Sequence, residues 1–231
     1  LFNSQANITI DIPWVKGLSL VGSFAYDFYQ QKYKQFKNVA YVYNYDQATG
    51  EYSKIIVPTI SSPSLTVEEK RTENLTGNVR ANYHNTFNEV HTIDAFFGFE
   101  ESKAKSSMLK GYRGNFASGV VPELPFGDSN TQTNDGLWGE TARINYFGRA
   151  MYDYDNKYML QFQFRYDGSQ NFPKGNRYGF FPGVSAGWTI SREAFMSDIN
   201  WLDNLKIRAS WGQMGNDVVD AYQYMVLYGL T

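Results

Sequence analysis

The chain has 231 residues, with 21 basic and 23 acidic side chains and a formal net charge of −2. Its 18 Tyr, 17 Phe and 5 Trp need more burial than a disordered chain provides, so disorder is excluded. A helical membrane protein is excluded because no run of about 20 apolar residues occurs. The lack of a basic stripe argues against a nucleic-acid partner, and the absence of cysteine excludes disulfides, thiolate catalysis and cysteine-ligated zinc.

Apolar and polar side chains alternate with a period of two residues along most of the chain, which is the pattern of β-strands. In chain order, strands are predicted near residues 6–12, 18–29, 75–84, 90–101, 143–154, 157–167, 178–191 and 205–212, with a ninth candidate near 221–229. The only helical signal is a short turn at Ser191–Ile199, with Ser191 as its N-cap. The sequence therefore predicts an all-β protein.

The strand at 157–167 shows the alternation most clearly. One face carries Tyr158, Leu160, Phe162, Phe164 and Tyr166. The opposite face carries Met159, Gln161, Gln163, Arg165 and Asp167. Tyrosines at both ends of an apolar face are typical of the aromatic girdles of outer-membrane barrels.

The predicted connections alternate between short and long. Short ones lie at 13–17, 85–89, 155–156 and 192–203, and longer ones at 30–71, 102–140, 168–177 and after Met214. Antiparallel up-and-down barrels of outer membranes have short turns on one side and long loops on the other. We therefore predict a transmembrane barrel segment of about eight or nine strands with long outer loops near 30–71 and 102–140. A soluble β-sandwich is the alternative, although its strands are usually shorter.

The segment RYDGSQNFPKGNRYGFFPGVSAGWTISREAFM, Arg165 to Met196, resembles the SusC/RagA family of TonB-linked outer-membrane transporters of the Bacteroidetes type. NLKIRASWGQMGN, Asn204 to Asn216, and GRAMYDYDNKYML are similar to neighbouring barrel segments of the family. LTGNVRANYHNTF and HTIDAFFGFEES resemble it more loosely.

This resemblance implies a barrel of 22 strands closed around an N-terminal plug. It also implies an outer-membrane location, a SusD-like surface lipoprotein as lid, energy supplied through TonB, and oligosaccharide or peptide cargo. Eight or nine strands cannot form that whole barrel, and no plug or TonB-contacting segment is recognisable. We therefore expect residues 1–231 to be part of the barrel domain and a middle piece of a longer protein. Its open sheet edges would need the rest of the chain.

Candidate functional residues fall into two groups. The first would face the lumen and meet the plug, the solute or one another: Arg80, Arg149, Gln161, Gln163, Arg165 and Arg208. The second lies in the outer loops as weak candidates for ligand binding: Tyr41, Tyr43, Tyr45, Tyr112 and Trp138. Exposed tyrosines at two-residue spacing, in a segment that could be a hairpin, can stack on sugar rings or grip a peptide. Packing within the loop or against a lid is the alternative.

No catalytic, cofactor or metal site is predicted. His84 and His91 are expected to face each other across the turn at 85–89, but no third metal ligand is evident. No nucleophile-elbow or phosphate-binding motif occurs. Glycines recur at Gly175, Gly179, Gly183 and Gly187, where they are expected to relieve crowding or permit bulges. The function predicted is transport rather than catalysis, with a soluble carbohydrate-binding β-domain of a surface protein as the alternative.

Overall fold

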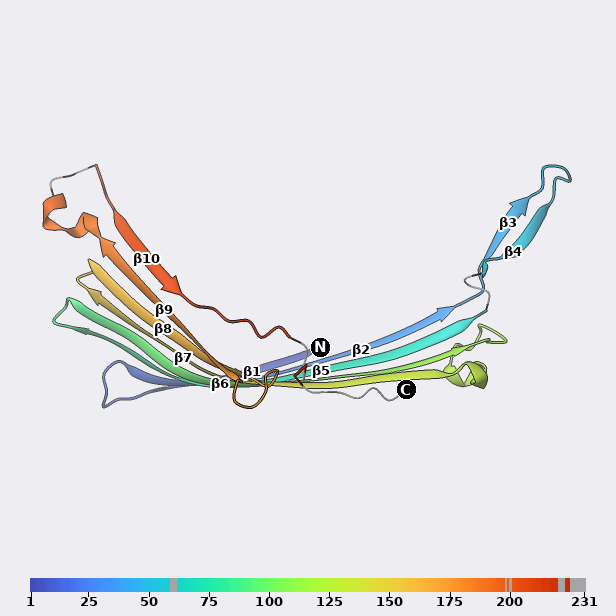
Figure 1. Cartoon of the computed structure of the whole chain (residues 1–231), viewed down its shortest axis with the longest axis horizontal. Coiled ribbons are helices and arrows are strands. Elements are labelled where there is room, and N and C mark those ends of the chain that lie inside the picture. Colours follow the sequence, from blue (N-terminus) through green and yellow to red (C-terminus); the bar gives the residue numbers. More distant parts are fainter. Residues whose placement is uncertain (59–61, 198, 200, 220–222, 225–231) are drawn as a thin grey trace. The chain divides into compact units, whose positions relative to one another are not determined.

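The computed structural model describes residues 1–58, 62–197, 199, 201–219 and 223–224 (Figure 1). The strands are β1 (Phe2–Asp11), β2 (Leu18–Lys37), β3 (Tyr41–Tyr45), β4 (Tyr52–Ile56), β5 (Ser64–Phe87), β6 (His91–Gly114), β7 (Thr133–Tyr154), β8 (Tyr158–Ser169), β9 (Tyr178–Thr189) and β10 (Lys206–Gly212). The described residues also include four short 3-10 turns: η2 (Leu124–Phe126), η3 (Ser129–Thr131), η4 (Ile190–Arg192) and η5 (Ala194–Met196). Within the described ranges, no helix is long and apolar enough to cross a bilayer.

The strands form an eight-stranded sheet in the order β1-β2-β5-β6-β7-β8-β9-β10, and a separate two-stranded sheet of β3 and β4. Neighbours in the large sheet are neighbours in the chain, except where the β3–β4 hairpin is inserted between β2 and β5. The predicted all-β, up-and-down topology is confirmed. The ninth strand candidate near 221–229 lies outside the described residues, apart from positions 223–224.

Four strands run much further than the sequence pattern predicts. β2 continues to Lys37, β5 begins at Ser64, β6 continues to Gly114 and β7 begins at Thr133. Most of the predicted loops at 30–71 and 102–140 are therefore strand. The added portions carry polar side chains on both faces, as in TVEEKRT of β5. Because period-two alternation is visible only when one face is apolar, such strands give no signal.

The chain divides into two compact units. Unit 1 comprises residues 1–2, 28–73 and 105–140, and unit 2 comprises residues 3–27, 74–104 and 141–231. In unit 1, the ring of Phe116 is buried and packs edge-on against Phe36, with the ring centroids 5.3 Å apart. The loop that carries Phe116 is held by Asp128, whose backbone amide donates a hydrogen bond to the Gly114 carbonyl oxygen at 3.0 Å.

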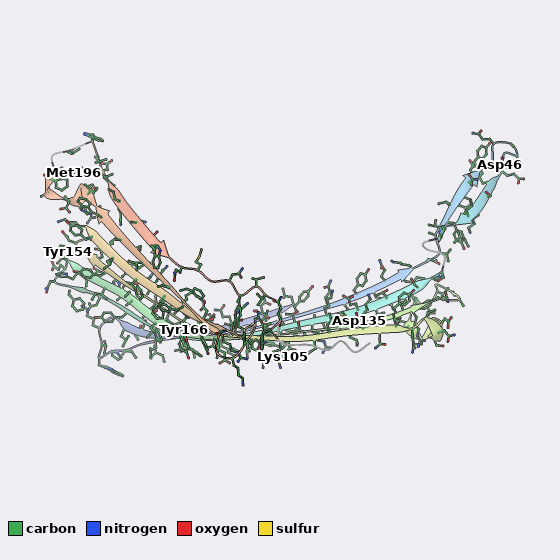
Figure 2. All side chains as sticks on the ribbon, viewed as in Figure 1. Asp46, Lys105, Asp135, Tyr154, Tyr166 and Met196 are labelled. Carbon is green, nitrogen blue, oxygen red and sulfur yellow. The ribbon has the colours of Figure 1, made fainter. Side chains whose placement is uncertain are left out.

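In unit 2, the pairing of β7, β8 and β9 aligns apolar side chains into one continuous face, with the strands side by side in Figure 1. Leu160 lies between Tyr152 and Ala186, and Phe162 lies between Ala150 and Val184. Tyr154 and Tyr166, labelled in Figure 2, mark the two ends of this face. Aromatic rings gather at both ends of the face. The ring centroids of Tyr154 and Tyr158 lie 6.3 Å apart at one end, and those of Tyr166 and Tyr178 lie 5.0 Å apart at the other.

This apolar face is exposed. Leu160 keeps 55% and Phe162 44% of their surface accessible, and nothing in the described part of the chain covers them. Only Leu65 and Phe116 are buried apolar side chains among the described residues. Soluble proteins rarely expose a large contiguous apolar patch, so another medium or another molecule must cover this face.

The turns at one end of the sheet are short. Asp155 and Asn156 both have positive φ angles, 49° and 54°, as a two-residue hairpin turn with right-handed strand twist requires. The predicted helical turn at Ser191–Ile199 is instead two 3-10 turns, and Ser191 lies inside η4 rather than at an N-cap. The side chain of Glu193 ties this segment to the sheet, because it accepts hydrogen bonds from Tyr158 Oη and Trp188 Nε1.

Glycines relieve crowding at two of the four predicted positions, Gly179 and Gly183, whereas the nearest atom to a Cβ on Gly187 would lie 3.4 Å away. A Cβ atom on Gly179 would lie 2.6 Å from the Phe181 ring, and one on Gly183 would lie 3.1 Å from Gln163. Gly175 has a φ of 102° and therefore occupies a turn that favours glycine. Gly98 shows the same crowding, because a Cβ there would lie 2.6 Å from the Phe147 ring.

We predict that Gly98→Ala destabilises the sheet by about 1–3 kcal/mol, since the added methyl group forces the Phe147 ring out of position. The measurement is the thermal unfolding midpoint of the intact polypeptide in detergent. Gly77→Ala is the matched control, because nothing lies within 4 Å of a Cβ atom at that position. Equal midpoints for the two variants would contradict the prediction.

Candidate functional site

The face of unit 2 opposite the apolar one carries a network of charged side chains. The Arg149 guanidinium donates to Asp94 Oδ1 at 2.7 Å, and His84 Nδ1 lies 3.5 Å from Asp94 Oδ2. Asn145 donates to Glu100 at 3.1 Å, and Arg165 donates to Asp167 at 2.9 Å. Asp94 and Asp167 are therefore each balanced by an arginine on the same sheet.

Aromatic rings are interleaved with the arginines on this face. The guanidinium carbon atoms of Arg80 and Arg149 lie 5.5 and 5.1 Å from the Phe96 ring centroid. The guanidinium carbon of Arg165 lies 5.8 Å from the Phe147 ring centroid. Such distances are typical of cation–π contacts. Sequence reasoning missed these rings, although Phe147 interrupts the alternation of its strand and could have signalled them.

The structure brings four of the predicted polar residues together. Arg149, Gln161, Gln163 and Arg165 line one cavity of about 790 Å³, with Trp211 at its edge. Arg80 does not line it and reaches it only through its contact with Phe96. Arg208 pairs with Gly187 in the β9–β10 ladder and has no acidic partner among the described residues.

A second cavity of about 450 Å³ lies towards the loop between β8 and β9. The segment after β10 forms one of its walls, with Gly215, Asn216 and Asp217 among the lining residues. Asp217 anchors this segment, because Arg143 donates to its two carboxylate oxygens at 2.7 and 3.1 Å. Asn171 adds a hydrogen bond to the Asp217 carbonyl oxygen at 3.3 Å. The hydrogen bonds from Arg143 hold the pKa of the Asp217 carboxyl below its usual value.

In unit 1, the three tyrosines at two-residue spacing lie on β3 of a hairpin. Tyr41, Tyr43 and Tyr45 share one face and remain 44%, 66% and 50% exposed. Tyr52 pairs with Tyr45, and their ring centroids are 5.0 Å apart. Lys54 Nζ lies 3.6 Å from the Tyr41 ring centroid. The hairpin therefore presents an accessible aromatic face.

Tyr112 and Trp138, the other two ligand candidates, lie on strands rather than loops. Tyr112 is near the end of β6 and is partly buried, whereas Trp138 is on β7 and 69% exposed. Within the described residues, neither ring stacks on the hairpin tyrosines. The structure therefore does not unite the five candidates in one site.

The expectation that His84 and His91 face each other is wrong. β5 extends to Phe87, so the turn is centred later in the chain than the sequence suggested. Across this turn, the hydroxyl oxygens of Thr86 and Thr92 lie 3.0 Å apart. His84 meets Asp94 on the charged face, whereas His91 Nδ1 lies 2.7 Å from Tyr152 Oη on the apolar face. The part of the chain that the structure describes contains no group of three or more His, Cys, Asp and Glu side chains that could hold a metal ion.

Known proteins with related sequences are TonB-dependent receptors. The chain is 30% identical over 167 residues to the TonB-dependent receptor P3 of Formosa agariphila, which covers 71% of the chain and 16% of that protein. It is 43% identical over 86 residues to the TonB-dependent receptor SusC of Bacteroides thetaiotaomicron, which covers 37% of the chain and 9% of that protein. No protein-family model matches the chain.

The fold is shared with a solved transporter. The match with the structure of the RagAB peptide transporter covers 97% of this chain and 24% of the transporter's chain, with a TM-score of 0.79 and 22% sequence identity. A sheet of this kind, with one apolar and one charged face, defines a segment of an outer-membrane-type β-barrel. The chain resembles a segment of the SusC/RagA-like TonB-dependent receptors, and the expected resemblance is confirmed. It spans about a sixth of the length of the curated P3 relative.

We predict that Asp217→Asn loosens the segment at 213–219, because it removes the carboxylate that Arg143 holds. A spin label at Val218→Cys should become more mobile at neutral pH in this variant. In the parent protein, the pKa of Asp217 is lowered in the folded state. The ion pair between Arg143 and Asp217 is therefore fully formed at any pH above the ordinary carboxyl pKa. The anchor should be lost only as the pH falls through that lowered value.

Asp203→Asn is the matched control for this experiment, since Asp203 carries an exposed carboxylate before β10. The control should leave the mobility of the label unchanged. Equal label mobility in Asp217→Asn and the parent protein at neutral pH would show that the ion pair does not hold the segment.

Proposed function

We propose that this chain forms part of the transmembrane barrel of a TonB-dependent transporter in the bacterial outer membrane. The observation that carries the proposal is the apolar face of β7–β9, which is bounded by aromatic rings at both ends. The eight residue steps from Tyr158 to Tyr166 correspond to about 26 Å of strand. With the usual tilt of barrel strands, this length covers about 20 Å along the membrane normal, which is most of an apolar band of about 25 Å.

The two edges of the sheet support a larger assembly. β1 and β10 each have one hydrogen-bonded neighbour in the eight-stranded sheet. Unpaired backbone groups are not tolerated in the hydrocarbon region, so further strands must close the barrel. The plug and the TonB-contacting segment belong to the N-terminal region in this proposal.

The charged face lines the lumen in this arrangement. Arg80, Arg149, Gln161, Gln163, Arg165 and Arg208 then point towards the plug or the solute. Most of the acidic neighbours on this face already pair with a basic side chain, as Asp94 does with Arg149. Charged side chains on this face agree with the polar interior of outer-membrane barrels.

The proposed cargo is an oligosaccharide or a peptide, taken up with a SusD-like surface lipoprotein as lid. Support comes from the related receptor SusC and from the solved RagAB structure, which is called a peptide transporter. The aromatic face of the β3–β4 hairpin is the proposed contact for cargo or lid, through Tyr41, Tyr43 and Tyr45. Tyr112 and Trp138 are proposed as further contacts. The chain binds and conducts the solute without covalent chemistry, cofactor or metal.

A soluble carbohydrate-binding domain is the less favoured function. Such a domain would bury Leu160 and Phe162 under a second layer, whereas both side chains are exposed here. The exposed face fits a lipid environment better than water.

Cysteine substitution tests which face meets lipid. We predict that a probe on Phe162→Cys in the intact transporter is quenched by lipid-soluble quenchers, whereas a probe on Gln163→Cys is quenched by aqueous ones. The chain itself contains no cysteine, so the introduced thiol is its only labelling site. The reverse pattern, or aqueous quenching at both positions, would contradict the barrel.

The size of the natural polypeptide gives an independent test. We predict that its denatured mass, measured on washed outer membranes, is several times the 26.5 kDa of this chain. A mass near 26.5 kDa would refute the transporter and favour a small barrel or a soluble β-domain.

A further inference from the structure

We propose that the smaller cavity of unit 2 binds a carboxylate group of the transported solute and that Arg177 pairs with it. The inference rests on the proposed transport function and deepens it by naming the chemistry that one site recognises. The cavity holds about 450 Å³, which lies within the range of small-molecule sites. All of its lining residues belong to unit 2.

The charges in the cavity wall are unequal. Three guanidinium groups line it, those of Arg143, Arg165 and Arg177, against the two carboxylates of Asp167 and Asp217. Each carboxylate is already paired with one arginine on the wall. Arg143 binds Asp217 and Arg165 binds Asp167. One positive charge therefore remains without a partner in the lining.

That charge belongs to Arg177. Its Nε donates to the Phe172 carbonyl oxygen at 3.2 Å, which orients the guanidinium group. Among the described residues, no carboxylate lies within ion-pair distance of Arg177, and its two terminal nitrogens have no hydrogen-bond acceptor. A planar guanidinium with two free donors matches a carboxylate in both geometry and charge.

The remaining wall suits the rest of a solute. Asn176 is exposed, and its side-chain amide is available to donate or accept a hydrogen bond. The rings of Phe172 and Phe181 provide apolar surface. Glu100 is not part of the lining, and its carboxylate accepts a hydrogen bond from Asn145. The Arg143–Asp217 pair holds Asp217 in the wall beside Gly215 and Asn216, so the site has an anchored wall as well as charge.

The carboxylate can come from an acidic sugar or from an acidic peptide, and the experiment separates these sources. Calorimetry on the intact transporter in detergent would use trigalacturonate against its neutral methyl ester. A second arm would use C-terminally amidated triglutamate against amidated triglutamine. We expect at least one carboxylate probe to bind about tenfold more tightly than its neutral counterpart, as a hydrogen-bonded charge pair allows. The arm that shows this preference identifies the source.

Three variants test the role of Arg177. Arg177→Gln should weaken binding of the carboxylate probe about tenfold and leave the neutral probe unchanged. Asp167→Asn should act in the opposite direction and tighten binding, because it removes the carboxylate that neutralises Arg165. Structural damage cannot produce such a gain. Lys174→Gln, which removes a positive charge from an exposed position in the same loop, should have no effect.

The inference would be overturned if neither carboxylate probe bound more tightly than its neutral counterpart, or if Arg177→Gln bound the acidic probe as the parent protein does. These outcomes are independent of uptake. A carboxylate-selective protein that imports nothing would contradict the proposed transport alone. A protein that imports solute without carboxylate selectivity would contradict only this inference.

Discussion

The hydrogen-bonded pairing of long antiparallel strands is the constraint on which the other features of this chain depend. Each strand satisfies its backbone polar groups through its neighbours, which leaves the side chains free to differ completely between the two faces. In β7–β9 one face is apolar and exposed, and the other carries charges. A soluble domain would bury the apolar face in a core. Here almost no core exists among the described residues, since only Leu65 and Phe116 are buried apolar side chains.

The opposite face of the sheet holds many ionised groups close together. It does so by internal pairing, as in Arg149 with Asp94 and Arg165 with Asp167. Rings such as Phe96 fill the gaps and contact the guanidinium planes. Arg208 and Arg177 differ from these arginines, because neither has a carboxylate partner among the described residues. Arg177 is the residue in the smaller cavity that fits this description.

The topology and the strands with one apolar face could be predicted from the sequence, and so could the SusC/RagA resemblance. The alternation at 157–167 predicts one apolar and one polar face, and the pairing of β8 with β7 and β9 aligns its apolar side chains with those of its neighbours. The outer parts of β5 and β6 could not be predicted, because polar residues on both faces leave no period-two signal. The sequence pattern also placed the turn after β5 too early in the chain. It therefore predicted that His84 and His91 face each other, whereas their partners lie on opposite faces of the sheet.

The sequence by itself determined that this chain is an all-β, transporter-like segment, because the strand period and the segments that resemble the family can be read directly from the order of residues. It also placed Gln161, Gln163 and Arg165 on one face of a strand, since alternation requires it. Only the tertiary structure decided which charges are compensated. Asp217 lies far from Arg143 in the chain and meets it only because the segment after β10 returns over β7. Pairing across such distances depends on how strands and loops pack, and no local pattern encodes it.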